Sequence, residues 1–454
     1  MTTSQQIGSI CQQYNALLIE ETDQALRIAS SKPPAEQMLS ALSFICDKPI
    51  QLETWPVQRI ALWQALYALS ASKEVSGNSL AELLNEVLST AIQQRASDIH
   101  FEPGQTTYRI RLRIDGVLHA QPLLPGSIAA QLTARLKVLA SLDIAEKRLP
   151  QDGQMDYQDG EHQASFRVST LPCRYGEKLV LRLQQQTSHC FDIDTLGMPA
   201  EESLRFHRAL ASPQGLILIT GPTGSGKTLS LYSALTRLNQ VHRNICTVED
   251  PIEIPLSGLN QTQLHTKAGL TYSTLLRALL RQDPDVIMIG EIRDSETADI
   301  AIKASQTGHL VLSTLHTHST IGTLMRLEQL NIPRDVLTSS LRLIVTQRLV
   351  RKLCLHCRQP PQNSPEQPLS AAYWQATGCN HCYSGYYGRT ALFEVLPVSE
   401  TLGGLINQGQ NATELEDIAR QSGMTTLFEN GCRAAAQGIT SLDEVYRVLG
   451  HHDG

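Results

Sequence analysis

The chain has 454 residues and a formal net charge of −6. This length is enough for about three domains, and the acidic balance argues against a generally basic nucleic-acid-binding surface. No segment approaches the roughly 18 consecutive apolar residues that span a bilayer, and the polar start Met1–Gln12 lacks the layout of a signal peptide. We therefore expect a cytoplasmic protein without a direct nucleic-acid partner.

The first 75 residues predict a small α/β domain. Apolar runs of strand length alternate with stretches of helical periodicity, and no cluster of chemically reactive side chains is present. We predict a docking or spacer domain, which ends at the polar segment Ser72–Asn78. The predicted elements are a short helix from Ile7, strands at Ala16–Ile19 and Ala25–Ile28, and helices at Glu36–Ile45 and Val57–Leu69.

Residues 79–186 predict a second domain that contains a sheet. A helical pattern at Ser79–Gln94 changes to period two in Asp98–Pro103 and Thr107–Gly116. In the second of these strands the apolar residues share one face, which leaves Arg109, Arg111 and Arg113 on the other. Such a face either binds phosphate or an acidic partner, or is simply solvated, and the sequence leaves both open.

The same domain continues with a helix, a turn and two strands. Arg167 and Arg182 lie on the two strands. The predicted ranges are a helix at Ala129–Leu142, a turn at Arg148–Gly153, strands at Ser165–Thr170 and Lys178–Leu183, and a linker at Gln184–His189.

A glycine-rich segment, Gly-Pro-Thr-Gly-Ser-Gly-Lys-Thr, lies between the apolar run Leu216–Ile219 and a helical pattern that begins at Leu229. Strand, glycine loop and helix in this order predict a phosphate-binding loop, in which backbone amides and a helix N-terminus surround a polyphosphate. We expect Lys227 to reach the β and γ phosphates and the Thr228 hydroxyl to bind Mg²⁺. The predicted nucleotide-binding residues are Gly221, Pro222, Thr223, Gly224, Ser225, Gly226, Lys227 and Thr228.

From about Leu196 onward, apolar strands alternate with helices, as in a parallel sheet that is covered on both faces. The predicted strand Val286–Ile289 ends in Gly290 and Glu291, and we expect it to lie beside the phosphate-loop strand. A carboxylate there can polarise the attacking water, so Glu291 is the predicted base, although it could instead cap the next helix. Glu249, at the end of another predicted strand, is the second candidate.

His309 and His316 bracket a further predicted strand within Thr307–Thr317. Either imidazole could orient the γ-phosphate through a hydrogen bond, and a structural role is equally compatible with the pattern.

Two C-x-x-C pairs follow, Cys354 with Cys357 and Cys379 with Cys382. Four thiolates at this separation can close a tetrahedral Zn²⁺ site, which predicts structural zinc. An iron–sulfur centre and free thiols are the alternatives. The tail from Ala391 to Gly450 is predicted to be helical and amphipathic.

The order of these motifs resembles that of the secretion ATPases, which drive type II secretion and type IV pilus assembly. The resemblance covers about residues 79–450 and looks closest to the HofB-type pilus-assembly proteins. It is carried by the phosphate loop, Thr247–Glu253, Ile289–Asp294, Thr307–Thr317, Asp98–Pro103 and the paired cysteines.

The resemblance implies an α/β fold with a RecA-like P-loop ATPase core and the cofactors ATP, Mg²⁺ and Zn²⁺. Arginines from the preceding domain would approach the nucleotide, and Arg167, Arg182 and Arg174 are the candidates. The implied domains are a small N-terminal α/β domain (1–75), a PAS-like domain (79–186) and a RecA-like domain (196–454) with a tetracysteine subdomain at about 350–390.

The implied function is that of a homo-hexameric motor, peripheral to the inner membrane through a platform protein. A pilus retraction motor, a RecA-like nucleic-acid translocase and a scaffold that binds ATP without hydrolysing it are the alternatives. Stimulation of hydrolysis by DNA would favour the translocase.

Overall fold

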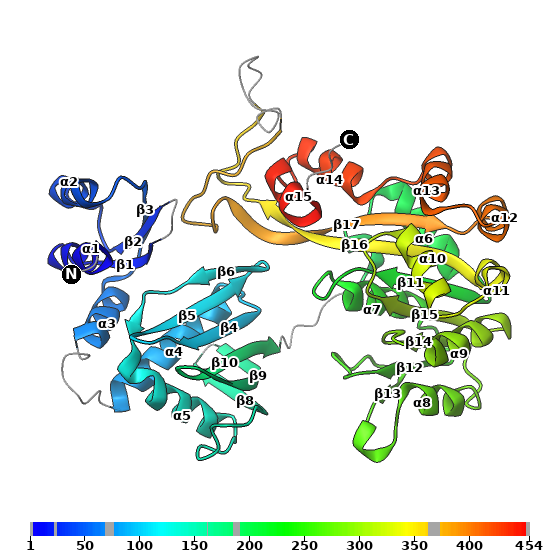
Figure 1. Cartoon of the computed structure of the whole chain (residues 1–454), viewed down its shortest axis with the longest axis horizontal. Helices are drawn as coiled ribbons and strands as arrows, with labels where there is room; N and C mark the ends of the chain where they lie inside the picture. Colours follow the sequence, from blue (N-terminus) through cyan, green and yellow to red (C-terminus); the bar gives the residue numbers. More distant parts are fainter. Residues whose placement is uncertain are drawn as a thin grey trace. The chain divides into compact units, whose positions relative to one another are not determined.

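The computed structural model describes residues 3–21, 25–68, 77–160, 162–184, 191–361 and 373–450. The chain forms two compact units, residues 1–188 and 189–454, and each has its own sheets (Figure 1). Most of the predicted boundary at Ser72–Asn78, the predicted linker after Gln184 and the segment between the cysteine pairs lie outside the described residues. Within the described part of the chain, no helix has the length and apolar character needed to cross a membrane.

The first unit begins with a three-stranded sheet in the order β1-β2-β3, with β1 antiparallel and β3 parallel to β2. Ile7, Leu26, Ile28 and Leu42 form its core. The sequence analysis missed β3, because its side chains are only partly buried and give no apolar pattern. The elements are α1 (Thr3–Gln13), β1 (Ala16–Glu21), β2 (Leu26–Ser30), α2 (Glu36–Ile45), β3 (Ile50–Thr54) and α3 (Val57–Ala68).

An antiparallel sheet in the order β6-β5-β4-β10-β9-β8 follows in the same unit, and β7 pairs with β5. The predicted turn at Arg148–Gly153 is wrong in its second half, because Gln151–Gly153 begin the edge strand β8. That strand alternates exposed polar residues, which resemble a turn in sequence. The elements are α4 (Gly77–Gln93), β4 (Asp98–Pro103), β5 (Thr107–Ile114), β6 (Val117–Ala120), β7 (Leu124–Pro125), α5 (Ala129–Leu139), β8 (Gln151–Asp159), β9 (His162–Cys173) and β10 (Gly176–Gln184).

The arginine face of β5 is largely paired within its own sheet. Arg111 Nη2 lies 2.7 Å from the Glu102 carboxylate, and Arg113 Nε lies 3.7 Å from that of Asp98. These pairs give two of the three arginines a partner and favour the solvated-face interpretation.

The second unit contains a seven-stranded sheet in the order β13-β12-β14-β15-β11-β16-β17. Neighbouring strands are parallel from β13 to β16, and β17 is antiparallel to β16. The strands are β11 (Gly215–Thr220), β12 (Ile245–Glu249), β13 (Asn260–Gln263), β14 (Val286–Ile289), β15 (Leu310–Leu315), β16 (Leu341–Leu353) and β17 (Tyr386–Pro397).

Two predictions about this sheet are wrong. The strand β15 lies between β14 and the phosphate-loop strand β11, so these two are not neighbours. The tail is not helical from Ala391, because Ala391–Pro397 complete β17; helices begin only at Glu400. The helices of this unit are α6 (Ala200–Leu210), α7 (Lys227–Leu238), α8 (Tyr272–Leu279), α9 (Ser295–Gln306), α10 (Thr320–Gln329), α11 (Arg334–Ser340), α12 (Glu400–Gln408), α13 (Ala412–Gln421), α14 (Leu427–Ala436) and α15 (Leu442–Leu449).

Both faces of the central strands are buried. Along β11, Leu216 and Leu218 enter one apolar core, whereas Ile217 and Ile219 enter a second core on the opposite face. Each such side chain contributes about 1.5–3 kcal/mol on burial. The two cores make the sheet a rigid support for the loops at the carboxyl ends of its strands.

Candidate functional site

The phosphate loop connects the end of β11 to the start of α7. Gly221, Gly224 and Gly226 have φ angles of 145°, 77° and 89°, which L-residues with side chains rarely adopt. A Cβ atom on Gly221 would lie 2.5 Å from the carbonyl oxygen of Gln347. The loop therefore depends on glycine for its shape, and this shape leads the chain into the N-terminus of α7.

The strand β16 supports the loop from the side. Gln347, which is 1% exposed, donates from Nε2 to the Ser225 carbonyl at 2.7 Å and accepts from the Ser230 hydroxyl at 2.8 Å. The hydroxyls of Thr220 and Thr346 lie 2.7 Å apart. The sequence analysis missed Gln347; a glutamine inside an apolar strand is the available signal, because a buried amide requires partners.

Lys227 lies at the first position of α7, and its ammonium group donates to the carbonyls of Gly221 (2.8 Å) and Pro222 (3.0 Å). Burial lowers its pKa to about 8; the charge of Glu291 opposes this change, and that of Arg348 adds to it. Glu291 and Arg348 are therefore both close enough to influence the charge of Lys227. Thr228 follows in the first turn of α7 and is exposed.

Glu291 follows β14 and lies at the same edge of the sheet as the loop, because β14, β15 and β11 are parallel and end at that edge. Its carboxylate pairs with Arg293 and lies 3.3 Å from His316 Nε2. Burial raises the pKa of Glu291, but Arg293 and His316 outweigh this influence and the pKa is lowered. Glu291 is thus ionised at neutral pH and can accept a hydrogen bond from water.

The alternative role of Glu291 as a helix cap is not observed. The N-cap of α9 is Asp294, which accepts from the Thr297 amide at 2.8 Å. Packing explains why position 290 is a glycine: a Cβ atom there would lie 2.9 Å from the Tyr272 hydroxyl. An aspartate at this position would require Tyr272 to move.

Glu249 ends β12 and is 4% exposed. Its Oε2 accepts from the Tyr232 hydroxyl at 2.5 Å, and its Oε1 accepts from Thr247 at 2.6 Å and from Gln261 at 3.0 Å. Both oxygens are engaged with the protein, which favours a supporting role for Glu249 over the role of base.

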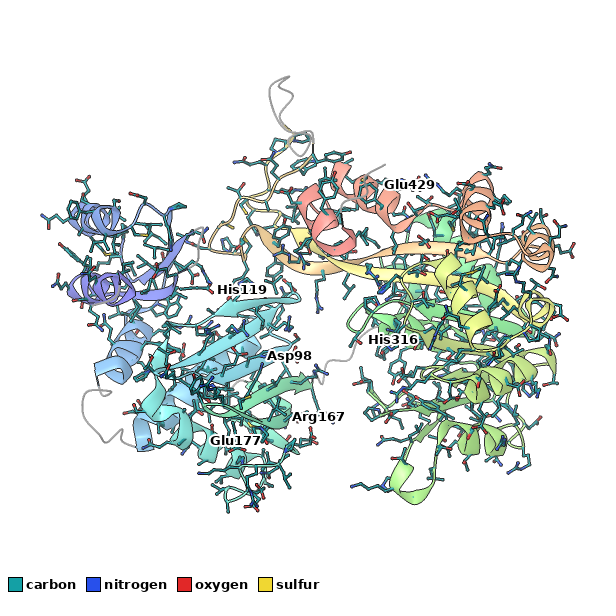
Figure 2. The ribbon with its side chains drawn as sticks, viewed as in Figure 1. Asp98, His119, Arg167, Glu177, His316 and Glu429 are labelled. Atoms are coloured by element: carbon teal, nitrogen blue, oxygen red, sulfur yellow. The ribbon has the colours of Figure 1, made fainter. Side chains whose placement is uncertain are left out.

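The two predicted histidines lie at opposite ends of β15. His316, labelled in Figure 2, follows its carboxyl end, and its Nε2 lies 3.3 Å from the Glu291 carboxylate. Its predicted contact with the γ-phosphate stays a prediction. His309 precedes the amino end: its carbonyl accepts from the amide of Gly215, the first residue of β11, and its ring lies 2.9 Å from the Ala304 carbonyl. A strand length of about 20 Å separates His309 from the loop, so its predicted contact with that loop's phosphates is wrong.

Arg167 and Arg182 are direct cross-strand neighbours on β9 and β10 of the first unit, where Figure 2 labels Arg167. Their side chains are 56% and 70% exposed. Arg182 pairs with Asp98 at 2.9 Å, and Arg167 lies 3.8 Å from Asp152. Exposed ion pairs of this kind are weak, so both guanidinium groups can exchange partners at little cost. Arg174, also exposed, lies over the Tyr175 ring at 5.5 Å.

The four predicted ligand cysteines form one cluster, with all Sγ atoms within 4.8 Å of one another. Three of the Sγ–Sγ separations are 3.7–3.8 Å. A tetrahedral site with Zn–S bonds of about 2.3 Å has edges of about 3.8 Å, so the spacing fits such a metal. His356 and His381 stack beside the cluster with ring centres 4.7 Å apart.

Comparisons with known proteins identify the family of this chain. The family model described as "Type II/IV secretion system protein" matches residues 73–447. The chain is 53% identical to "Protein transport protein HofB homolog" of Escherichia coli K12 (99% of each chain). It is 45% identical to "Type IV pilus assembly ATPase PilB" of Pseudomonas aeruginosa, over 83% of this chain and 69% of the relative.

Among solved structures, the pilus retraction motor PilT with bound ADP matches with a TM-score of 0.54 and 26% identity, over 81% of this chain and 97% of that one. The mixed α/β architecture of the second unit is thus shared with a nucleotide-binding relative. Because the family model spans most of the chain and includes the loop, Glu291 and the cysteine cluster, this chain belongs to the type II/IV secretion system protein family and is an ATPase of the pilus-assembly and type II secretion group.

Proposed function

We propose that this protein is a cytoplasmic motor that couples ATP hydrolysis to assembly of a type IV pilus or a type II secretion pseudopilus. The observation that carries the proposal is that Glu291 and the phosphate loop with Lys227 follow parallel strands that end at the same edge of the sheet. Lys227 supplies charge for the β and γ phosphates, and the ionised Glu291 orients water for attack on the γ-phosphate. His316 and Arg293 fix the direction of that carboxylate.

The Mg²⁺ ion of such a site neutralises phosphate charge, and the exposed Thr228 hydroxyl at the start of α7 is suited to hold it. The four cysteines would hold Zn²⁺ with no open coordination position, which assigns that metal a structural role. Their soft thiolates and tetrahedral spacing support zinc over harder ions.

In this proposal the second unit is the RecA-like core and residues 79–186 are the PAS-like domain. Closure of one on the other during the ATP cycle would bring Arg167 or Arg182 to the phosphates, with Arg174 as a third candidate. Their exposure and weak ion pairs support this role. The motor would act as a homo-hexamer on an inner-membrane platform protein, with residues 1–75 as the docking domain.

The test compares ATP turnover of the purified wild-type protein with that of Lys227→Ala and Glu291→Gln. We expect Lys227→Ala to abolish turnover and Glu291→Gln to slow it roughly 10²- to 10⁴-fold while ATP binding persists. Lys303→Ala and Glu296→Gln are matched controls, because both residues are exposed in ion pairs on α9. Loss of ATP affinity in Glu291→Gln with unchanged turnover at saturation would show that the base lies elsewhere.

Arg167→Ala and Arg182→Ala test the arginines in the same assay. If either arginine stabilises the charge that develops on the transferred phosphoryl group, turnover in its alanine variant falls roughly 10³-fold. The cellular arm uses a deletion strain: surface pili or a secreted substrate should be lost, restored by the wild-type gene and not restored by Glu291→Gln. A deletion strain with neither defect would contradict the motor assignment.

A further inference from the structure

Arg348 lies beside the phosphate loop, and the proposed function gives it no role. It follows Gln347 on β16 and stands two residues beyond Thr346, which pairs with Thr220 at the end of β11. Arg348 therefore lies beyond the last paired residue of β11, at the edge of the sheet where the phosphate loop begins. Its charge also contributes to the lowered pKa of Lys227, after the larger effect of burial, in agreement with this position beside the loop.

The hydrogen bonds of Arg348 are incomplete. Nη2 donates to Nδ1 of His318 at 2.7 Å, so His318 accepts through Nδ1 and carries its proton on Nε2. Nη1 is buried and makes no hydrogen bond within the described parts of the chain. Burial lowers the pKa of Arg348, and the charge of Glu394, whose carboxylate oxygens already accept from the amides of Thr320 and Leu427, only partly opposes this. A buried donor of a charged group is costly when it is unpaired, and the cost is recovered when an anion binds.

The surroundings indicate which anion fits. A planar guanidinium group presents parallel N–H donors that match phosphate oxygens. Lys227 is the loop residue expected to contact the β and γ phosphates, and Arg348 on the neighbouring strand β16 would add a second cation to the same site.

We propose that Arg348 binds the γ-phosphate of ATP from within the same chain, and that His318 is the positioning residue that sets its guanidinium group. The inference rests on the proposed ATPase function and extends it, because it gives the chain its own means to distinguish ATP from ADP. Arg167 and Arg182 are then not the only arginines available to the phosphates.

The test measures binding of Mg²⁺ with ATPγS and of Mg²⁺ with ADP to the full-length protein. Arg348→Ala should weaken ATPγS binding roughly 10- to 100-fold, the range of one charge-assisted hydrogen bond, and should leave ADP binding within about twofold. Arg342→Ala is the matched control: it lies on the same strand, six residues earlier, where its Nε donates to the Gln214 carbonyl. It should change neither affinity.

His318 is tested by two substitutions. His318→Ala should reduce the preference for ATPγS over ADP, and His318→Asn should restore most of it, because the Asn carbonyl can accept from Nη2. If Arg348→Ala folds poorly, Arg348→Lys is the second variant. It keeps the positive charge but lacks the parallel N–H donors of a guanidinium group, so it should lose part of the preference for ATPγS over ADP.

An equal loss of both nucleotides in the Arg348 variants, or no loss of either, would overturn the inference. Failure of the proposed function is distinguishable, since it would appear as absent ATP turnover in the wild-type protein.

Discussion

The glutamine that supports the phosphate loop gives a prediction whose size follows from the structure. Gln347→Met keeps the side-chain length but removes one donor and one acceptor, so the Ser225 carbonyl and the Ser230 hydroxyl lose their partners. Ser225 and Ser230 are 3% and 2% exposed, which leaves little access for replacement water. An unpaired buried group costs about 1–3 kcal/mol, so the substitution should cost roughly 2–5 kcal/mol.

The assay is thermal unfolding of the second unit together with ATP binding. At about 2–4 °C per kcal/mol, the expected fall in melting temperature is roughly 5–15 °C, with weaker ATP binding because the loop loses its lateral support. Gln306→Ala is the control: this exposed glutamine makes one hydrogen bond to Ser339, and its loss should cost less than about 0.5 kcal/mol. Unchanged melting and unchanged ATP affinity in Gln347→Met would refute the assignment of Gln347 as the support of the loop.

Three further predictions follow from other contacts. Burial holds the pKa of Lys227 at about 8 in the free protein, and a bound triphosphate raises it; ATP binding should therefore take up protons above pH 8 and weaken as pH rises. Calorimetry in buffers of different ionisation enthalpy measures the uptake, which should disappear in Lys227→Arg; the same uptake in that variant would exclude Lys227 as its source. Gly290→Ala should lower the free energy of unfolding by about 1–3 kcal/mol, because the new Cβ atom would contact the Tyr272 hydroxyl. In a Tyr272→Phe background the same substitution should cost less, and an equal cost in the wild-type and Tyr272→Phe backgrounds would contradict this contact. Elemental analysis should find one zinc per chain, and its binding should contribute on the order of 10 kcal/mol to local folding. The zinc should be absent from the double variant Cys354→Ser, Cys379→Ser and retained in the control Cys432→Ser. Less than half an equivalent of zinc in the wild-type protein, with no other metal, would reject the zinc assignment.

Local signals in the sequence were sufficient for the glycine-dependent shape of the phosphate loop and for the cysteine cluster, because each depends on residues that are close in the chain. The sequence singled out Glu291 at the end of a buried strand, but for a wrong reason, since β14 is not the neighbour of β11. The order of strands was not accessible in the same way. Nothing in the local pattern of β14 indicates that β15 separates it from β11, since that order depends on how distant segments pack. The error at His309 has a simpler cause: a residue before a parallel strand lies at the edge opposite to the phosphate loop.

The long pair β16 and β17 was missed for a different reason. Both strands mix apolar residues with polar ones, such as Thr346 and Gln347 in β16 and Glu394 in β17. Several of these polar groups find their partners far away in the sequence. Gln347 illustrates this: its hydrogen bonds join it to residues more than a hundred positions earlier. Arg348 and His318 became recognisable only when the fold placed them beside the loop.

The strand β16 also has a mechanical consequence. It is one continuous strand from Leu341 to Leu353, and the next residue is the first cysteine of the cluster (Figure 1). It pairs with β17 from Leu343 to Arg351 and again at Leu353 after an irregularity, and about 20 Å separates Arg348 from Cys354 along it. Because a paired strand resists stretching, a displacement of Gln347 and Arg348 at the nucleotide end would be transmitted along β16 toward the cysteine cluster.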